Sequence, residues 1–326
     1  MTAALNELLR GTSRSFYLTL RVLPAAVRPQ ISLAYLLART ADTIADTDAL
    51  PLDQRLAALR EFREAILDSA PPHSFDSFAA QQASQAEKTL LQRPPEALAA
   101  LSRLSQPDQQ LIREVLSTII SGQELDLLRF GANKGGAGAA LDTDAELDDY
   151  TYRVAGCVGE FWTRLCRAHL FPRAPLNDEQ LIADGVRFGK GLQLVNVLRD
   201  LPADLANGRC YLPRESLRAA GLEPATLLAP ENEAKFVPLY RGHLDIAEQH
   251  LSAGWRYTTT LPYGQFRVRL ACAWPILIGL KTIQKLRASS VAQIRERVKI
   301  SRGEVRAIVA RSLLAAPFPL LWRRLA

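Results

Sequence analysis

Helical hydrophobic periodicity extends along most of this 326-residue chain and restricts its fold more than any other feature. Apolar residues recur every three to four positions, as they do on the buried face of an α-helix. No two runs of alternating Val, Ile or Thr are joined by a hairpin-type turn, so we expect essentially no sheet. Long helices are predicted at 30–48, 53–69, 107–129, 142–170, 177–200, 231–260 and 263–287, and shorter ones at 4–10, 76–91, 95–104 and 303–314.

Proline and glycine residues separate these helices without forming an inter-domain linker. Two proline pairs, 71–72 and 94–95, bound a variable-looking insertion, and residues 131–138 (GANKGGAG) form the loop predicted to be most flexible. The chain contains no internal repeat of fixed period. We therefore expect a single all-α domain over residues 1–326.

The formal net charge of +6 suits three kinds of partner: nucleic acid, an anionic membrane surface or a polyanionic substrate. Ordinary solubility explains it equally well. No basic run is interleaved with aromatic residues, and none of the common nucleic-acid motifs is present. We therefore expect no nucleic-acid partner.

The four cysteines are spaced neither as a CxxC metal site nor as a disulfide framework. We interpret them as reduced core thiols of a cytoplasmic protein. They are Cys157, Cys166, Cys210 and Cys272.

The sequence predicts no membrane-spanning segment. The N-terminus lacks the basic and then apolar order of residues that a signal peptide has. The longest uncharged apolar stretch, 270–280, is far short of the ~20 residues that a spanning helix needs. The tail 317–326 (PFPLLWRRLA) is apolar and basic. It fits either a peripheral contact with a membrane surface or packing on the core, and packing is slightly favoured.

A stripe of polar and charged residues lies along the first long helix. Two carboxylates one helical turn apart repel each other, and a bound Mg²⁺ would remove that penalty and bridge them to a diphosphate. If such a pair occurs only once, the alternative to a metal site is a charged helix face that is exposed to solvent. The stripe comprises four residues that share about 60° of arc, Tyr35, Arg39, Asp42 and Asp46.

A second stripe lies on the helix predicted at 177–200 and comprises Gln193, Asn196, Asp200 and Asp204. Amides that lead into a second carboxylate pair on an apolar helix argue against a solvated surface for both stripes. Together they indicate one cavity with acidic walls that face each other. Pro202 lies between the two aspartates and lacks a backbone N–H, so we expect the helix to kink or end there.

Diphosphate-binding groups are close in sequence to both acidic pairs. Residues 12–16 (Thr-Ser-Arg-Ser-Phe) precede the first pair, and Arg39 and Arg199 lie three and one positions before an aspartate. Hydroxyls and guanidinium groups beside metal-binding acids form a diphosphate trap. Between the stripes, Gly156 and Gly159 allow either a ligand or another helix to approach closely.

Other enzyme signatures are missing from the sequence. It contains no GxSxG, HExxH or P-loop motif, and no GxGxxG after a strand. The four scattered histidines are interpreted as structural or surface residues.

The ordered motifs resemble those of the squalene/phytoene synthase family. The resemblance covers roughly residues 12–215 and continues more weakly beyond them. It is carried by Ser13-Arg14-Ser15-Phe16, Tyr35-LLARTADTIAD, Tyr150-TYRVAGCVG and Gln193-LVNVLRDLPAD, then by Cys272-AWP and Val298-KISRG.

This resemblance implies an isoprenoid synthase fold, with helices around one central cavity, and an enzyme of isoprenoid biosynthesis that leads to sterols or hopanoids. The implied substrate is farnesyl diphosphate, two molecules of which are joined head to head. Implied Mg²⁺ ligands are Asp42, Asp46, Asn196, Asp200 and Asp204. Implied substrate-binding residues are Ser13, Arg14, Tyr35, Arg39, Gln193 and Arg199, and Tyr35, Arg39 and Tyr150 are the implied catalytic residues.

Two features depart from the family pattern, because Ala45 and Ala203 stand where family members often carry an extra acidic residue. The opening motif and the late motifs look more like the squalene-forming branch, which implies NADPH. Its implied binding residues are Ser15, Phe16, Val158, Gln193, Asn196, Pro275, Lys299 and Arg302. A phytoene-, dehydrosqualene- or hydroxysqualene-forming enzyme remains the alternative, and a non-catalytic family scaffold is disfavoured by the four aspartates.

Overall fold

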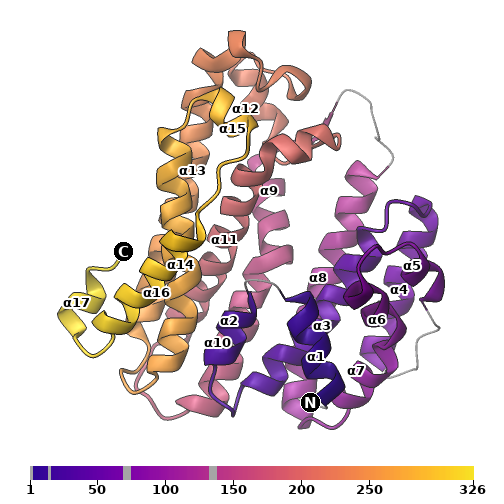
Figure 1. Ribbon diagram of the computed structural model, residues 1–326, viewed down its shortest axis with the longest axis vertical. Coiled ribbons are helices and arrows are strands. Elements are labelled where there is room, and N and C mark those ends of the chain that lie inside the picture. The colour runs from indigo at the N-terminus through magenta and orange to yellow at the C-terminus, as the bar shows by residue number, and fades with distance from the viewer. Residues whose placement is uncertain (1–2, 14–15, 69–74, 132–137) are drawn as a thin grey trace. The chain divides into compact units, whose positions relative to one another are not determined.

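The computed structural model describes residues 3–13, 16–68, 75–131 and 138–326 (Figure 1). Its residues group into two compact units, each of which is described by itself. Unit 1 consists of residues 1–132 and 161–172, and unit 2 consists of residues 133–160 and 173–326. The expectation of a single domain stays a prediction.

Unit 1 is built around α3 (Arg28–Ala45), which packs against α8 (Gln106–Phe130) and α4 (Leu52–Asp68). Pro29 stands in the first turn of α3, where its missing N–H costs no helical hydrogen bond. Apolar residues such as Leu37 and Ile44 are fully buried. The remaining helices of the unit are α1 (Ala3–Thr12), α2 (Phe16–Val22), α5 (Asp76–Ala80), α6 (Gln85–Gln92), α7 (Pro94–Leu101) and the C-terminal part of α10 (Cys157–Leu170).

Unit 2 is built around α11 (Asp178–Ala206), which packs against α13 (Glu233–Thr260), α14 (Phe266–Ala288) and the π-helical turn η1 (Tyr152–Gly156). The turn η1 joins α9 (Asp144–Thr151) to α10, where the sequence predicted one regular helix. The smaller elements are α12 (Arg214–Ala219), η2 (Pro224–Thr226), η3 (Pro230–Asn232), α15 (Val291–Arg295), α16 (Arg302–Ala315) and α17 (Pro319–Arg323).

The described residues contain one very small sheet, which the sequence did not predict. Strands β1 (Ala139–Ala140) and β2 (Arg209–Cys210) form a two-stranded parallel sheet of two residues each. The expectation of an all-α protein is otherwise confirmed, and so is the burial of all four cysteines as free thiols. No described helix is long and apolar enough to cross a membrane.

Helix α11 continues through Pro202, so of the two outcomes expected at this proline, a kink or an end, the end is wrong. Proline removes the N–H that would bond to the carbonyl of residue 198. The hydroxyl of Tyr240, from α13, donates to Leu198 O at 2.8 Å and satisfies that buried acceptor. The helix thus keeps Asp200 and Asp204 on consecutive turns.

Glycines allow backbone contact between α11 and the η1–α10 segment. A Cβ atom on Gly159 would lie 1.9 Å from Gly185 O, and one on Gly189 would lie 2.1 Å from Ala155 O. These distances leave no room for a methyl group, and backbone atoms cannot rotate away as a side chain can. The sequence left open whether a ligand or another helix approaches Gly159 closely. In the structure the close neighbour is another helix.

We predict that Gly159→Ala destabilises the protein by about 1–3 kcal/mol or more, because the new methyl group overpacks two backbones. Gly242→Ala is the matched control: it also lies within a helix, and its Cβ would meet nothing within 4 Å. The control should hold or raise stability by up to about 1 kcal/mol. Urea unfolding measures both changes, and equal stabilities of the two variants would contradict the contact.

Candidate functional site

The first acidic pair lies at the C-terminal end of α3. Asp42 is in its last turn, and Asp46 is the C-cap residue with its N–H bonded to Asp42 O. Gln123, on α8, donates a hydrogen bond from Nε2 to Asp42 Oδ1. The second oxygen of Asp42 lies 4.0 Å from Arg39 Nη1, at the outer limit of an ion pair.

Burial and the neighbouring Asp46 carboxylate raise the pKa of Asp42 to about 6, against the opposing effects of Arg39 and Gln123. The Asp42 side chain is nevertheless 46% exposed, so solvent and ions reach it. Gln123 Oε1 is buried without a hydrogen-bond partner among the described residues. The Asp42 carboxylate, which Asp46 repels, lies beside the amide of Gln123, and this arrangement fits a hard cation such as Mg²⁺.

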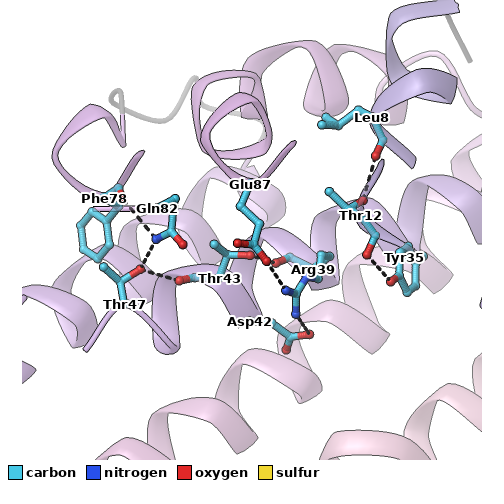
Figure 2. A network of polar contacts seen from close by, with 10 residues as sticks. All are labelled: Leu8, Thr12, Tyr35, Arg39, Asp42, Thr43, Thr47, Phe78, Gln82 and Glu87. Atoms are coloured by element: carbon cyan, nitrogen blue, oxygen red, sulfur yellow. Dashed lines mark hydrogen bonds and ion pairs between the residues drawn. The ribbon is translucent and has the colours of Figure 1, made fainter. Parts of the chain in front are cut away.

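Arg39 is held chiefly by Glu87 and more loosely by Asp42 (Figure 2). Its Nη2 donates to Glu87 Oε1 at 2.7 Å, and Glu87 comes from α6. Burial lowers the pKa of the Arg39 guanidinium, but the charges of Asp42 and Glu87 outweigh it and raise that pKa. Glu87 was not predicted from the sequence, because it lies in the segment interpreted as a variable insertion.

Tyr35 and the end of α1 lie on the same side of this network (Figure 2). The Tyr35 hydroxyl donates to Thr12 O at 3.3 Å, and the Thr12 hydroxyl donates to Leu8 O at 2.9 Å. Ser13 is buried, and its hydroxyl has no partner among the described residues. Arg14 and Ser15 lie outside the described residues, and Phe16 begins α2.

In the second acidic pair, on α11, Asp200 is bound by two arginines. Arg199 reaches both oxygens of Asp200, at 3.1 Å from Nε and 2.5 Å from Nη2. Arg297, from the segment between α15 and α16, reaches Oδ1 at 2.7 Å from Nη2. Burial would raise the pKa of Asp200, but the hydrogen bonds and charges of Arg199 and then Arg297 hold it below its usual range.

Arg297 was not predicted from the sequence. It has a left-handed backbone with φ of 64°, which is unfavourable for any residue other than glycine. Strained backbone is retained where surrounding contacts determine it, and the ion pair with Asp200 is such a contact. A cation at Asp200 would have to displace this arginine, so the described arrangement at Asp200 does not fit a metal as it stands.

A chain of side-chain hydrogen bonds joins α11 to Tyr150 on α9. Asn196 donates to Gln193 Oε1 at 3.5 Å, and Gln193 Nε2 donates to Tyr150 Oη at 3.1 Å. The Tyr150 ring is buried and stacks on Tyr211, with 4.5 Å between the ring centroids. Because its oxygen accepts from an amide, Tyr150 is better suited to donate its own proton than to act as a base.

The residue set implied for NADPH stays a prediction; within it, Asn196 and Gln193 are hydrogen-bonded to each other. Val158 lies on α10 and Pro275 inside α14, whereas Lys299 and Arg302 lie before and at the start of α16. None of these four is hydrogen-bonded to Gln193 or Asn196 in the part of the chain that is described. Likewise, no group of three His, Cys, Asp or Glu residues that could hold a metal ion is found in the described part of the chain.

Comparison with known proteins agrees with these motifs. The family model described as squalene/phytoene synthase matches residues 9–304. Squalene synthase ERG9 from Saccharomyces cerevisiae is 31% identical over 227 residues, which cover 70% of this chain and 49% of ERG9. Presqualene diphosphate synthase from Sinorhizobium fredii is 32% identical over 211 residues, which cover 64% of this chain and 61% of that protein.

The chain thus spans about half of the length of the curated relatives that it matches. Among solved structures, the complex of TcSQS with the ligand BPH1237 is 24% identical, with a TM-score of 0.77. That alignment covers 97% of this chain and 88% of the other. At this identity the likeness shows the fold alone, which is of the squalene-synthase type.

We predict opposite effects on stability when each aspartate pair loses a charge. The folded-state pKa of Asp42, about 6, exceeds its ordinary 3.8. Its stabilising contribution is therefore complete below pH ~3.8 and is lost as pH rises through about 6. Asp42→Asn should be about 1 kcal/mol more stable than wild type at pH 8. This figure is smaller than the full pKa shift implies, because solvent screens the exposed part of the side chain. At pH 4 the two proteins should have the same stability.

Asp200 has a lowered pKa, so its contribution is present at neutral pH and is lost only in acid. Asp200→Asn should therefore be less stable at pH 8, and Arg297→Gln should reproduce part of that loss. Repulsion between carboxylates one helical turn apart would by itself make the loss of either aspartate stabilising, and the two arginines reverse that expectation at Asp200. Denaturant unfolding in EDTA at pH 4 and pH 8 measures the four proteins, and a stabilised Asp200→Asn would refute the ion-pair explanation.

Proposed function

This chain belongs to the squalene/phytoene synthase family, and we propose that it joins two farnesyl diphosphates head to head and reduces the product to squalene. The family match over residues 9–304, with both aspartate pairs retained, is the observation that carries the proposal. The similarity to a squalene synthase over 70% of the chain supports the reductive outcome.

In the proposed reaction, the C1–O bond of one farnesyl diphosphate breaks and its diphosphate leaves with the electron pair. The double bond of the second molecule attacks the allylic cation, and loss of a proton closes a cyclopropane to give presqualene diphosphate. A second departure of diphosphate gives a cation that rearranges. NADPH, when bound, supplies the hydride that quenches this cation.

The residues of unit 1 support binding and departure of a diphosphate. Asp42 and Asp46, with the oxygen of Gln123, would hold Mg²⁺, which neutralises the charge of the leaving group. Arg39 stands beside them and is shared with Glu87. The buried hydroxyl of Ser13, which has no partner among the described residues, is available as a further donor to a diphosphate oxygen.

In unit 2, we propose that Tyr150 donates a hydrogen bond to a departing diphosphate. The chain from Asn196 through Gln193 orients its oxygen, and stacking on Tyr211 fixes the ring. Arg199 would bind diphosphate, and Arg297 would join it once released from Asp200. Lys299 and Arg302 are proposed, from the family resemblance, to bind the phosphates of NADPH.

Synthesis of presqualene diphosphate as the final product is a second candidate function. A presqualene diphosphate synthase is as similar to this chain as the squalene synthase is. The two functions share the first half-reaction and differ only in the reductive step. For either, we propose that the enzyme works in the cytoplasm at a membrane surface.

We predict that NADPH changes the product and leaves the rate of the first step unchanged. The first half-reaction needs no reductant, whereas the last cation requires hydride. Gas chromatography–mass spectrometry should detect squalene with NADPH, and presqualene diphosphate, as the alcohol after phosphatase treatment, without it. Presqualene diphosphate under both conditions would replace squalene synthesis with the second candidate, and a preferred C40 product from geranylgeranyl diphosphate would replace both.

We also predict that farnesyl diphosphate binds only weakly without Mg²⁺. Carboxylates near a diphosphate repel it by a few kcal/mol at a protein-like effective dielectric constant. Titration calorimetry should show affinity falling at least tenfold in EDTA for the wild type. Asp42→Asn should lose turnover together with this dependence on Mg²⁺. Equal affinity with and without EDTA would contradict the assignment of the metal site.

A further inference from the structure

Exposed apolar side chains gather in two neighbouring segments of unit 2. Of the eleven large apolar residues that are exposed in the described part of the chain, seven lie within 263–266 and 313–321. The most exposed are Leu314 at 74% and Leu320 at 75%. The others are Tyr263, Phe266, Leu313, Phe318 and Leu321. We call these seven residues the apolar face.

Specific contacts hold the apolar face in place. The Tyr263 hydroxyl donates to Ala316 O at 3.0 Å, which ties the loop before α14 to the end of α16. In α17, Trp322 is buried, stacks on Trp255 with 5.7 Å between centroids, and lies under the Arg269 guanidinium at 4.9 Å. These contacts anchor one side of α17, the yellow helix near the C-terminus in Figure 1, and leave Leu320 and Leu321 in solvent.

Charge is strongly segregated along the chain, and the apolar face lies in the basic part. Residues 249–326 contain fourteen Lys and Arg but only two acidic residues, Glu296 and Glu304, a net charge of +12. Residues 1–248 contain 26 basic and 32 acidic residues, a net charge of −6. Arg311, Arg323 and Arg324 are exposed beside the apolar residues. No acidic residue occurs in 249–295 or 305–326, the two stretches that supply the apolar face.

We infer that this face docks on the surface of an anionic lipid bilayer, with the leucines and Phe318 inserted among the acyl chains and the arginines at the headgroups. Exposed apolar side chains that share acid-free stretches of the chain with exposed arginines suit an anionic interface. A second copy of this chain would bring a like-charged face against it, which disfavours self-association. The tyrosine at its edge matches the amphipathic residues that prefer the headgroup level.

Docking on a bilayer would serve the proposed function, on which this part of the inference rests. The substrate has an anionic headgroup and a long apolar chain, and squalene is a hydrocarbon with almost no solubility in water. An enzyme seated on the bilayer can take its substrate from that surface and release its product into it. Binding to lipid needs no turnover, so it can be tested apart from the catalytic proposal.

The test is sedimentation of the intact protein with sucrose-loaded vesicles of phosphatidylcholine alone or with 30 mol% phosphatidylglycerol. We expect binding to the anionic vesicles that weakens as salt is raised. Leu314→Gln/Leu320→Gln/Leu321→Gln should reduce the affinity at least tenfold. Arg323→Gln/Arg324→Gln should reduce it about 25-fold, which is about fivefold for each arginine at a membrane surface.

Matched controls change exposed residues of the same types elsewhere. Leu67→Gln/Ile246→Gln and Arg103→Gln/Arg218→Gln should bind within twofold of wild type, since these positions lie outside the apolar face. Thermal midpoints within a few degrees of wild type would show that all variants fold. Retained activity on detergent-solubilised substrate would show that the site is intact.

The inference is overturned if wild type binds neither vesicle, if it binds both equally, or if the leucine variant binds as tightly as wild type. It is also overturned if ultracentrifugation finds a dimer that the leucine variant abolishes while vesicles remain unbound, because the occupant is then a second copy. Should the protein make no C30 product yet bind anionic vesicles through this face, the proposed function fails and the docking surface stands.

Discussion

Backbone contact between α11 and the η1–α10 segment is the constraint on which the candidate site in unit 2 depends. Gly159 and Gly189 remove the side chains that would keep these helices apart, and each faces a backbone oxygen of the opposite segment. The close approach fixes Tyr150 on α9 within hydrogen-bond reach of Gln193 on α11. Tyr150, which is proposed to assist the departure of diphosphate, is therefore placed by glycines that need not touch a substrate.

Continuity of α11 beyond Pro202 depends on one hydrogen bond from another helix. Proline leaves a buried carbonyl without its helical donor, and an unsatisfied buried acceptor costs about 1–3 kcal/mol. Tyr240 supplies that donor from α13. The second acidic motif therefore keeps its helical spacing through a tertiary contact, although its own sequence contains a residue that normally breaks helices.

The two acidic pairs have the same sequence spacing but different electrostatic surroundings. Burial and the neighbouring Asp46 carboxylate raise the pKa of Asp42, and its nearest arginine is bound mainly to Glu87. Asp200 has a lowered pKa, because Arg199 and Arg297 both bind it. The first pair is thus suited to attract a cation directly, whereas the charge of Asp200 is already balanced by two arginines.

Periodicity alone determined the helical class, and ordered motifs determined the family, because both depend on residues close together in the sequence. Helices such as α8 and α13 were predicted to within two residues, since their apolar stripes begin and end with breakers. Side-chain spacing also predicted the two aspartate pairs. Only the tertiary structure showed that Glu87, Gln123 and Arg297 are their partners, because each comes from a distant segment with no motif of its own. It likewise decided that α11 passes through Pro202, since the donor that replaces the lost N–H lies on another helix, 42 residues from the carbonyl it satisfies.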